Sequence, residues 1–123
     1  MDEAILESWR KRLENDREET RRSLVRVQAE GRGLSQECPT DSGEVSVTTF
    51  SREFLFQQST QRRQLLRKID AALERIRNRT FGECAECGEE IDVKRLEAMP
   101  FTAYCRECQE NLERQGSGER KLA

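Results

Sequence analysis

The stretch that decides the fold contains four cysteines in two pairs, Cys84-Ala-Glu-Cys87 and Cys105-Arg-Glu-Cys108. Two residues separate the cysteines of each pair, and seventeen residues separate the two pairs. This spacing is typical of zinc sites, because each pair brings two thiolates to one tetrahedral ion. Gly88 follows the first pair and permits the tight turn that wraps a metal. The spacing predicts that Cys84, Cys87, Cys105 and Cys108 bind one zinc ion.

Two other uses of these cysteines fit the rest of the chain less well. A thioredoxin-type redox pair needs a strand–helix–strand context, which the surrounding residues do not predict. Two disulfides conflict with a reducing compartment. Since four cysteines fill all four coordination positions of a tetrahedral zinc ion, the ion is expected to be structural. We expect the zinc-finger module to comprise residues 81–114. The apolar residues nearby suffice only for a cap around the metal: Phe81, Ile91, Leu96, Met99, Phe101 and Tyr104.

Two long runs without Pro or Gly precede the module, from Asp2 to about Glu30 and from about Phe50 to Arg79. Both have seam positions at alternating spacings of three and four, as in a coiled coil. The first seam is Leu6, Trp9, Leu13, Asp16, Thr20, Leu24 and Val27, and the second is Phe54, Gln58, Gln61, Leu65, Ile69, Ala72 and Ile76. Gly31 and Gly33 are expected to end the first helix.

The two seams match when the helices fold back on each other. Leu13 then meets Ile69 and Leu6 meets Ile76, so that paired residue numbers add to about 81. We therefore expect a mainly α protein with a long antiparallel helical hairpin over 1–80, with arms roughly 40 Å long at 1.5 Å per residue. A tip loop is expected at about 32–48. Residues 115–123 are expected to be disordered because they are rich in Gly, Ser and charge.

Composition narrows the classes of function. The 123 residues are 34% hydrophobic and 37% charged, and they include no His, the commonest general base. This argues against an enzyme. Lys+Arg 22 nearly balance Asp+Glu 24, which disfavours a general nucleic-acid binder. The acidic N-terminus resembles no signal peptide, and no run is long enough to span a membrane. We expect a cytoplasmic monomer.

The expected tip loop holds Cys38, Asp41 and Glu44. Taken alone, the two acids are better explained as ordinary turn residues, because Asp-Ser-Gly is itself a turn sequence. Cys38 is best explained as an incidental thiol, with redox sensing as the second interpretation.

The residues from 50 to 110 resemble the DksA/TraR family of bacterial transcription factors. The resemblance is carried by Phe81-Gly82-x-Cys84-x-x-Cys87-Gly88, by Arg95-Leu96-Glu97-Ala98-x-Pro100 and by Cys105-x-x-Cys108, all after a helical hairpin. It implies a protein that binds RNA polymerase and not DNA. Family members insert the coiled coil through the secondary channel and place acidic tip residues near the catalytic centre, which changes the lifetime of promoter complexes.

The family tip, Asp-x-x-Asp-x-Ala, corresponds here to Asp41-Ser-Gly-Glu44-Val-Ser46. The resemblance therefore implies that Asp41 and Glu44 modulate the polymerase. Leu65 and Lys68 match the helical part of the family's site for guanosine tetraphosphate. Three positions where the family has a cation are Gln61, Met99 and Gln109 in this chain. Because contacts from cations to phosphate are strong, we expect a weak or absent response to this nucleotide.

Two other functions compete with this one. The chain could be a zinc-stabilised helical adaptor for another protein, with the tip as a simple turn. Direct DNA or RNA binding through the zinc module is disfavoured by the acids around the first cysteine pair, Glu83, Glu86, Glu89, Glu90 and Asp92.

Overall fold

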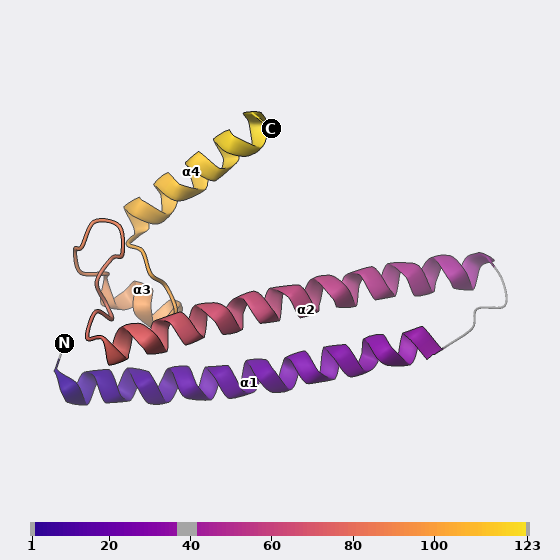
Figure 1. The fold of residues 1–123 in the computed structure, drawn as a ribbon, viewed down its shortest axis with the longest axis horizontal. Coiled ribbons are helices and arrows are strands. Elements are labelled where there is room, and N and C mark those ends of the chain that lie inside the picture. Colours follow the sequence, from indigo (N-terminus) through magenta and orange to yellow (C-terminus); the bar gives the residue numbers. More distant parts are fainter. Residues whose placement is uncertain (1, 37–41, 123) are drawn as a thin grey trace. The chain divides into compact units, whose positions relative to one another are not determined.

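The computed structural model describes residues 2–36 and 42–122, with side chains described for 2–32 and 49–115. Four helices follow in the order α1 (Glu3–Gln36), α2 (Ser42–Arg77), α3 (Val93–Ala98) and α4 (Arg106–Leu122). An isolated antiparallel bridge between Glu83 and Glu90 is the β-structure within these described ranges. The prediction of a mainly helical protein whose two long helices form a hairpin is confirmed (Figure 1).

The chain divides into two compact units. One comprises Met1–Leu13 with Ile69–Ala123, and the other comprises Glu14–Lys68. Each unit contains a portion of α1 and an antiparallel portion of α2, and the zinc module belongs to the first.

The core of the first unit contains the seam residues that were predicted to be buried between the helices. Leu6 and Leu13 of α1 and Ile69, Ala72 and Ile76 of α2 are all buried. Burying each of the Leu and Ile side chains contributes about 1.5–3 kcal/mol and stabilises this helix pair. The Trp9 ring also lies 5.7 Å from the Phe81 ring, at an interplanar angle of 48°, and joins α1 to the start of the zinc module.

In the second unit the predicted seam of α2 is wrong at two positions. Phe54 is 51% exposed and Gln61 is exposed, whereas Ser59 is buried and Leu55 and Arg62 are half-buried. The prediction used a coiled-coil repeat of 3.5 residues per turn. An ordinary α-helix has about 3.6, so its inward face drifts by roughly 20° per heptad. Counting back from Ile69 in steps of 3.6 gives the positions nearest to Leu65, Arg62, Gln58 and Leu55, all of which are half-buried, and buried Ser59 is next to Gln58.

The ends of the long helices also differ from the prediction. α1 continues through Gly31 and Gly33 to Gln36, and α2 begins at Ser42, so helix occupies much of the expected tip loop at 32–48. Glycine inside a helix costs only about 1 kcal/mol relative to Ala, so two glycines need not end a long helix. α4 likewise includes 115–122, where composition predicted disorder.

The C-terminus of α2 sets the direction in which the chain enters the zinc module. The Thr80 N–H donates to the Arg75 carbonyl at 2.9 Å, and the Arg79 N–H donates to the Ile76 carbonyl at 3.1 Å. These two hydrogen bonds form a Schellman motif, in which the residue after the helix adopts a left-handed conformation. Arg79 does so, with φ 61°. Its guanidinium also pairs with Glu3 of α1 at 2.6 Å.

Candidate functional site: a four-cysteine metal centre

The four predicted cysteines lie together in the structure. Their sulfur atoms are all within 4.8 Å of one another, and the sulfurs of Cys87 and Cys105 are 3.8 Å apart. A tetrahedral ion with Zn–S bonds of about 2.3 Å requires sulfurs roughly 3.8 Å apart. The spacing therefore fits zinc bound by four thiolates and is too long for disulfide bonds, which are about 2.05 Å.

The first cysteine pair is held in a tight turn of the main chain. The Gly88 N–H donates to the Cys84 carbonyl at 2.9 Å, and the Cys84 N–H donates to the Glu89 carbonyl at 2.8 Å. Gly88 has φ 76°, a conformation that glycine adopts without strain. The turn leaves Cys84 buried and Cys87 exposed, so one side of the metal centre faces solvent.

The second cysteine pair is positioned by the start of α4. Cys105 immediately precedes the helix, and its carbonyl accepts a hydrogen bond from the Gln109 N–H at 2.9 Å. The Ala85 N–H donates to the Ala103 carbonyl at 2.8 Å and joins the two halves of the site. One pair is therefore presented by a turn and the other by the first turn of a helix.

The protein environment divides the thiols by pKa. Burial raises the pKa of Cys84, but N–H groups of Cys87, Cys105 and Glu86 outweigh it and bring this pKa from 9.0 to about 6. A hydrogen bond with Cys105, together with burial, raises the pKa of Cys108. The Glu89 N–H lowers the pKa of Cys87. The hydrogen bond with Cys84 and burial together raise this pKa by more, so that the net shift is upward. One thiolate forms readily, and a cation is needed to stabilise the others.

The segment between the two cysteine pairs packs through α3. Asp92 caps this helix by accepting a hydrogen bond from the Lys94 N–H at 3.2 Å. The cap defines the start of the helix, whose Leu96 is fully buried. Phe81 and Ile91 of the predicted apolar cap are buried as well. Met99, expected in the same cap, is 37% exposed instead.

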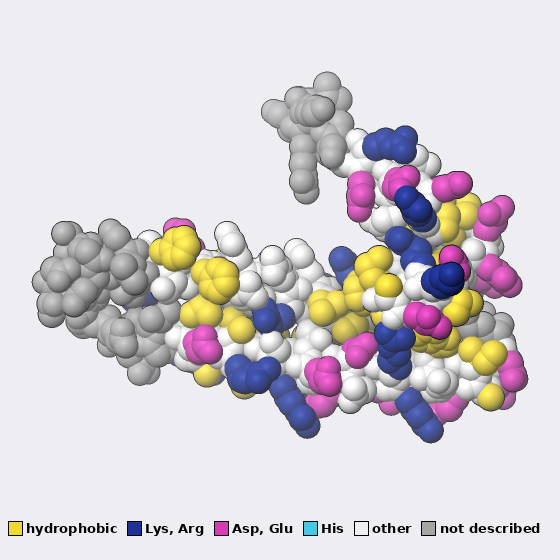
Figure 2. All heavy atoms as spheres, turned by 180° about the vertical axis from the view of Figure 1, so that it is seen from behind, with side chains coloured by type: hydrophobic (Ala, Val, Ile, Leu, Met, Phe, Trp, Pro, Cys, Tyr) yellow, Lys and Arg dark blue, Asp and Glu magenta, His cyan; other side chains and the backbone are white. Residues whose placement is uncertain are grey.

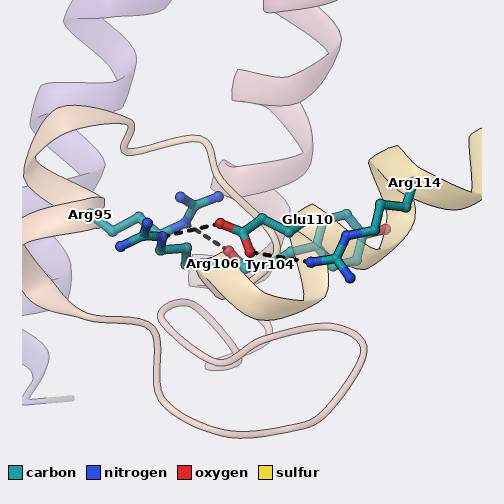
Figure 3. Close-up of polar contacts among 5 residues, drawn as sticks. All are labelled: Arg95, Tyr104, Arg106, Glu110 and Arg114. Carbon is teal, nitrogen blue, oxygen red and sulfur yellow. Dashed lines mark hydrogen bonds and ion pairs between the residues drawn. The ribbon is translucent and has the colours of Figure 1, made fainter. Parts of the chain in front are cut away.

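Three arginines hold the main chain that leads into the second cysteine pair. Arg75 of α2 donates to the carbonyls of Phe101 and Thr102, both at 3.2 Å. Burial lowers the pKa of the Arg75 guanidinium, partly opposed by Tyr104, and this shift leaves it charged at neutral pH. Arg95 of α3 donates to the Tyr104 carbonyl at 3.1 Å (Figure 3).

The third arginine comes from α1. The Arg12 guanidinium lies 5.4 Å from the centre of the Trp9 ring and donates a hydrogen bond to the Glu97 carbonyl. None of these arginine contacts was predicted. The position of Arg75 between the seam residues Ala72 and Ile76 was the available signal, since an arginine beside a buried face needs acceptors for its N–H groups.

On α4, Glu110 lies between two arginines (Figure 3). Its carboxylate pairs with Arg106 at 3.2 Å and with Arg114 at 3.8 Å. Both pairs are solvent-exposed and contribute at most about 1 kcal/mol, so they support the helix without defining a site.

The remaining predicted site residues are placed as follows. Cys38 and Asp41 lie outside the described residues, and Glu44 belongs to the first turn of α2. Leu65 is half-buried, while Lys68, one turn further along α2, is exposed. Gln109 is half-buried in the first turn of α4. None of the described helices combines the length and apolar character that a membrane span requires.

The fold and the site together define a class, a helical hairpin that carries a four-cysteine zinc finger. Residues 79–114 match the prokaryotic dksA/traR C4-type zinc finger. The structure is similar to that of transcription factor DksA2 from Pseudomonas aeruginosa, with a TM-score of 0.82, 30% sequence identity and coverage of 94% of this chain and 88% of that one. The chain belongs to the DksA/TraR family.

Sequence similarity extends to further proteins. An uncharacterized protein of Aquifex aeolicus is 38% identical over 113 residues, which are 90% of this chain and 72% of that protein. The RNA polymerase-binding transcription factor DksA of Escherichia coli strain K12 is 34% identical over 104 residues, or 85% of this chain. The match spans 64% of the length of that DksA. As in the family, the module contains a structural zinc ion.

Proposed function

We propose that the protein is a DksA-type transcription regulator that binds RNA polymerase through its secondary channel and modulates transcription initiation. The single observation that carries this proposal is the similarity to DksA2 over 94% of the chain, which includes both long helices as well as the zinc finger. The relatives named as RNA polymerase-binding factors are 34% identical over 85% of the chain. A narrow helical pair is the kind of element that can enter a channel.

Within this function, Cys84, Cys87, Cys105 and Cys108 bind the zinc. The support is the arrangement of their sulfurs, all within 4.8 Å of one another. Since four thiolates saturate a tetrahedral ion, zinc supplies folding energy and no open position for a reaction. The protein then acts by binding and not as an enzyme.

The acidic side chains of Asp41 and Glu44 act at the tip of the hairpin. They follow the family's acidic tip pattern, with Glu in place of the second Asp and Ser46 in place of Ala. Acidic groups brought close to the metal ions and basic loops of a polymerase act electrostatically over several ångströms. The two long helices would bind RNA polymerase, and these two carboxylates would modulate transcription initiation.

The protein works in the cytoplasm as a monomer, contacts polymerase and not DNA, and responds weakly or not at all to guanosine tetraphosphate. Only Leu65 and Lys68 keep the family's residues for that nucleotide, because Gln61, Met99 and Gln109 lack the family's positive charges.

Transcription with purified RNA polymerase tests the mechanism. Asp41→Asn should leave binding to polymerase within about twofold of the wild type and abolish the effect on open-complex lifetime, because it removes a charge at the tip and no docking contact. Asp70→Asn is the matched control, since Asp70 is an exposed aspartate of α2 in the other unit. It should behave as the wild type does.

Two results would change the conclusion. If Asp41→Asn regulates like the wild type, the tip mechanism is wrong. If the wild-type protein does not bind polymerase, and crosslinking in cells enriches a different protein, the chain is a zinc-stabilised adaptor.

A further inference from the structure

Two residues near the start of α1 contact the zinc module, which lies far away in the sequence. The Trp9 ring lies 5.7 Å from the Phe81 ring. One turn later, the Arg12 guanidinium donates a hydrogen bond to the main-chain carbonyl of Glu97, 85 positions away in the chain. All four residues belong to the same compact unit. We call these two contacts, made by Trp9 and Arg12, the α1 clamp.

The α1 clamp contacts both segments that bring the cysteine pairs together. Phe81 lies three residues before Cys84 and is 4% exposed. Glu97 belongs to α3, in the segment between the first cysteine pair and the second. The four sulfurs lie within 4.8 Å of one another only while these two segments keep their positions. A helix that binds one residue in each segment therefore favours the arrangement that fits zinc.

The hydrogen bond from Arg12 depends on the folded state of α3. The last carbonyls of a helix have no partner within the helix, and a cation placed there is favourable. Glu97 is the next-to-last residue of α3, so its carbonyl is such an acceptor. The Trp9 ring, 5.4 Å from the Arg12 guanidinium, stabilises the donor by a cation–π interaction. Because α3 lies within the loop that zinc closes, this acceptor is in place when the module is folded around the ion.

A third contact between α1 and the start of the module contributes less. The Glu3 carboxylate pairs with the Arg79 guanidinium at 2.6 Å, and both side chains are more than 70% exposed. Figure 2 shows charged side chains of both signs spread over the visible face of the molecule. Water and salt screen such exposed pairs, which are worth little. The attachment of α1 to the module therefore depends mainly on the α1 clamp.

We infer that Trp9 and Arg12 are positioning residues of the zinc site, and that zinc binding is coupled to the docking of the first turns of α1. These residues act on the ion through Phe81 and the main chain of Glu97, and not as ligands. Contacts made only in the zinc-bound fold raise the affinity for zinc, and zinc strengthens the attachment of α1 by the same factor. This inference goes beyond the proposed function, and it holds whether or not the protein binds RNA polymerase.

A purely structural role for Trp9 and Arg12 would give a different thermodynamic result. If they only stabilised the helix pair, their loss would lower the free energy of unfolding equally with and without zinc, and zinc affinity would not change. A positioning role lowers the free energy of unfolding of the zinc-loaded protein alone. Zinc affinity therefore distinguishes the two roles.

Zinc affinity is measured on the full chain by competition with a chelator. Trp9→Ala removes the ring, and Arg12→Met removes the donor but keeps much of the stem. Phe54→Ala is the control for the first variant, because Phe54 is a 51% exposed aromatic residue of the other unit. Arg22→Met is the control for the second, because Arg22 is an exposed arginine of α1 in the other unit and pairs with Glu18 at 3.3 Å.

Trp9→Ala and Arg12→Met should each weaken zinc binding about tenfold, as expected for loss of an aromatic pair or of a hydrogen bond from a charged donor. Both controls should stay within about twofold of the wild type. Trp9→Phe should also stay within about twofold, because it keeps an aromatic ring beside Phe81. Urea unfolding of the metal-free proteins should be the same for the wild type and for all variants.

Fluorescence of Trp9 gives a second measurement, since the chain contains one tryptophan. Zinc added to the metal-free protein should shift the Trp9 emission to shorter wavelength, because the half-buried ring then packs beside Phe81 and away from water. The midpoint should equal that of zinc binding. The matched reporter is the double variant Trp9→Phe with Phe54→Trp, which moves the tryptophan to the other unit. Its emission should not respond to zinc.

Three results would overturn the inference. If Trp9→Ala and Arg12→Met bind zinc as tightly as the wild type, the α1 clamp does not position the site. If their metal-free forms lose as much stability as their zinc-loaded forms, the two residues are only structural. If the reporters at positions 9 and 54 respond alike, zinc stabilises the whole chain and not the docking of α1.

Discussion

Arg75 of α2 donates a hydrogen bond at 3.2 Å to the main-chain carbonyl of Thr102, three residues before Cys105. The same guanidinium nitrogen lies 3.2 Å from the Phe101 carbonyl. One helix residue thus holds the segment that delivers the second cysteine pair.

Arg75→Met should therefore destabilise the zinc module. Methionine keeps much of the apolar stem but removes the donor, and the two carbonyls lose their partner, at a cost of about 2 kcal/mol. Urea unfolding measures this change. Arg77→Met is the control, because Arg77 is exposed and pairs with Glu74 one turn away. Equal stability of the two variants would contradict a structural role for Arg75.

Cys84→Ser should abolish zinc binding and unfold residues 81–105. Cys84 is the buried member of the cluster, and a small module without its metal has too little apolar core to stay folded. Native mass spectrometry should find one zinc per wild-type chain and none in the variant. Cys38→Ser should keep its zinc. A Cys84→Ser protein with full zinc content would show that the ligands are assigned incorrectly.

Zinc affinity should fall steeply as the pH is lowered. Zinc binds thiolates, so every proton that it displaces weakens apparent binding tenfold per pH unit. The raised pKa values of Cys87 and Cys108 mean that at least these two thiols are protonated at neutral pH in the metal-free protein. Affinity should therefore drop about 100-fold between pH 8 and pH 7.

Below about pH 6 the Cys84 thiolate, whose pKa is lowered to about 6, also takes up a proton and the dependence becomes steeper. Competition with a chelator of known affinity measures the slope. A change of less than tenfold per pH unit between pH 8 and pH 7 would mean that the thiols are already ionised.

Two glycines should respond in opposite ways to alanine. Neither position is crowded, since an added Cβ would meet nothing within 4 Å at Gly31 or at Gly88. Gly31 lies in a helix, so Gly31→Ala should raise the free energy of unfolding by about 0.5–1 kcal/mol. Gly88 has φ 76°, so Gly88→Ala should lower it by about 1–2 kcal/mol. Thermal or urea unfolding compares them directly, and a stabilised Gly88→Ala would refute the backbone argument.

The double variant Met99→Arg with Gln109→Lys should gain a response to guanosine tetraphosphate in transcription with polymerase. Both substitutions restore cations at positions where the family pattern has them, and Met99 is exposed enough to accept a charge. The wild type should change little when the nucleotide is added. A strong wild-type response would show that Leu65 and Lys68 suffice.

The zinc module could be predicted from the sequence because its information is local. Two short cysteine spacings and Gly88 define the metal and the turn, and the structure brings the four sulfurs together as expected. The burial of Leu13 and Ile69 was also predictable, since both are large apolar residues at seam positions near one end of the helix pair.

The seam of the second unit was less predictable for a physical reason. Its central residues are polar, so little burial energy distinguishes Phe54 from Leu55 as the inward residue. The 3.6-residue period of the helix therefore sets the inward face, and Leu55 is half-buried while Phe54 is exposed. The tip residues Cys38 and Asp41 remain predictions, as they lie outside the described residues.

The arginine contacts around the second cysteine pair have a consequence for mutational tolerance. Arg12, Arg75 and Arg95 all bind main-chain oxygens, which every amino acid possesses. The side chain at Glu97 can therefore change without loss of the Arg12 hydrogen bond, whereas each arginine has no substitute as the donor. In a saturation mutagenesis library selected for folded protein, exposed position 97 should accept more varied residues than positions 12, 75 and 95.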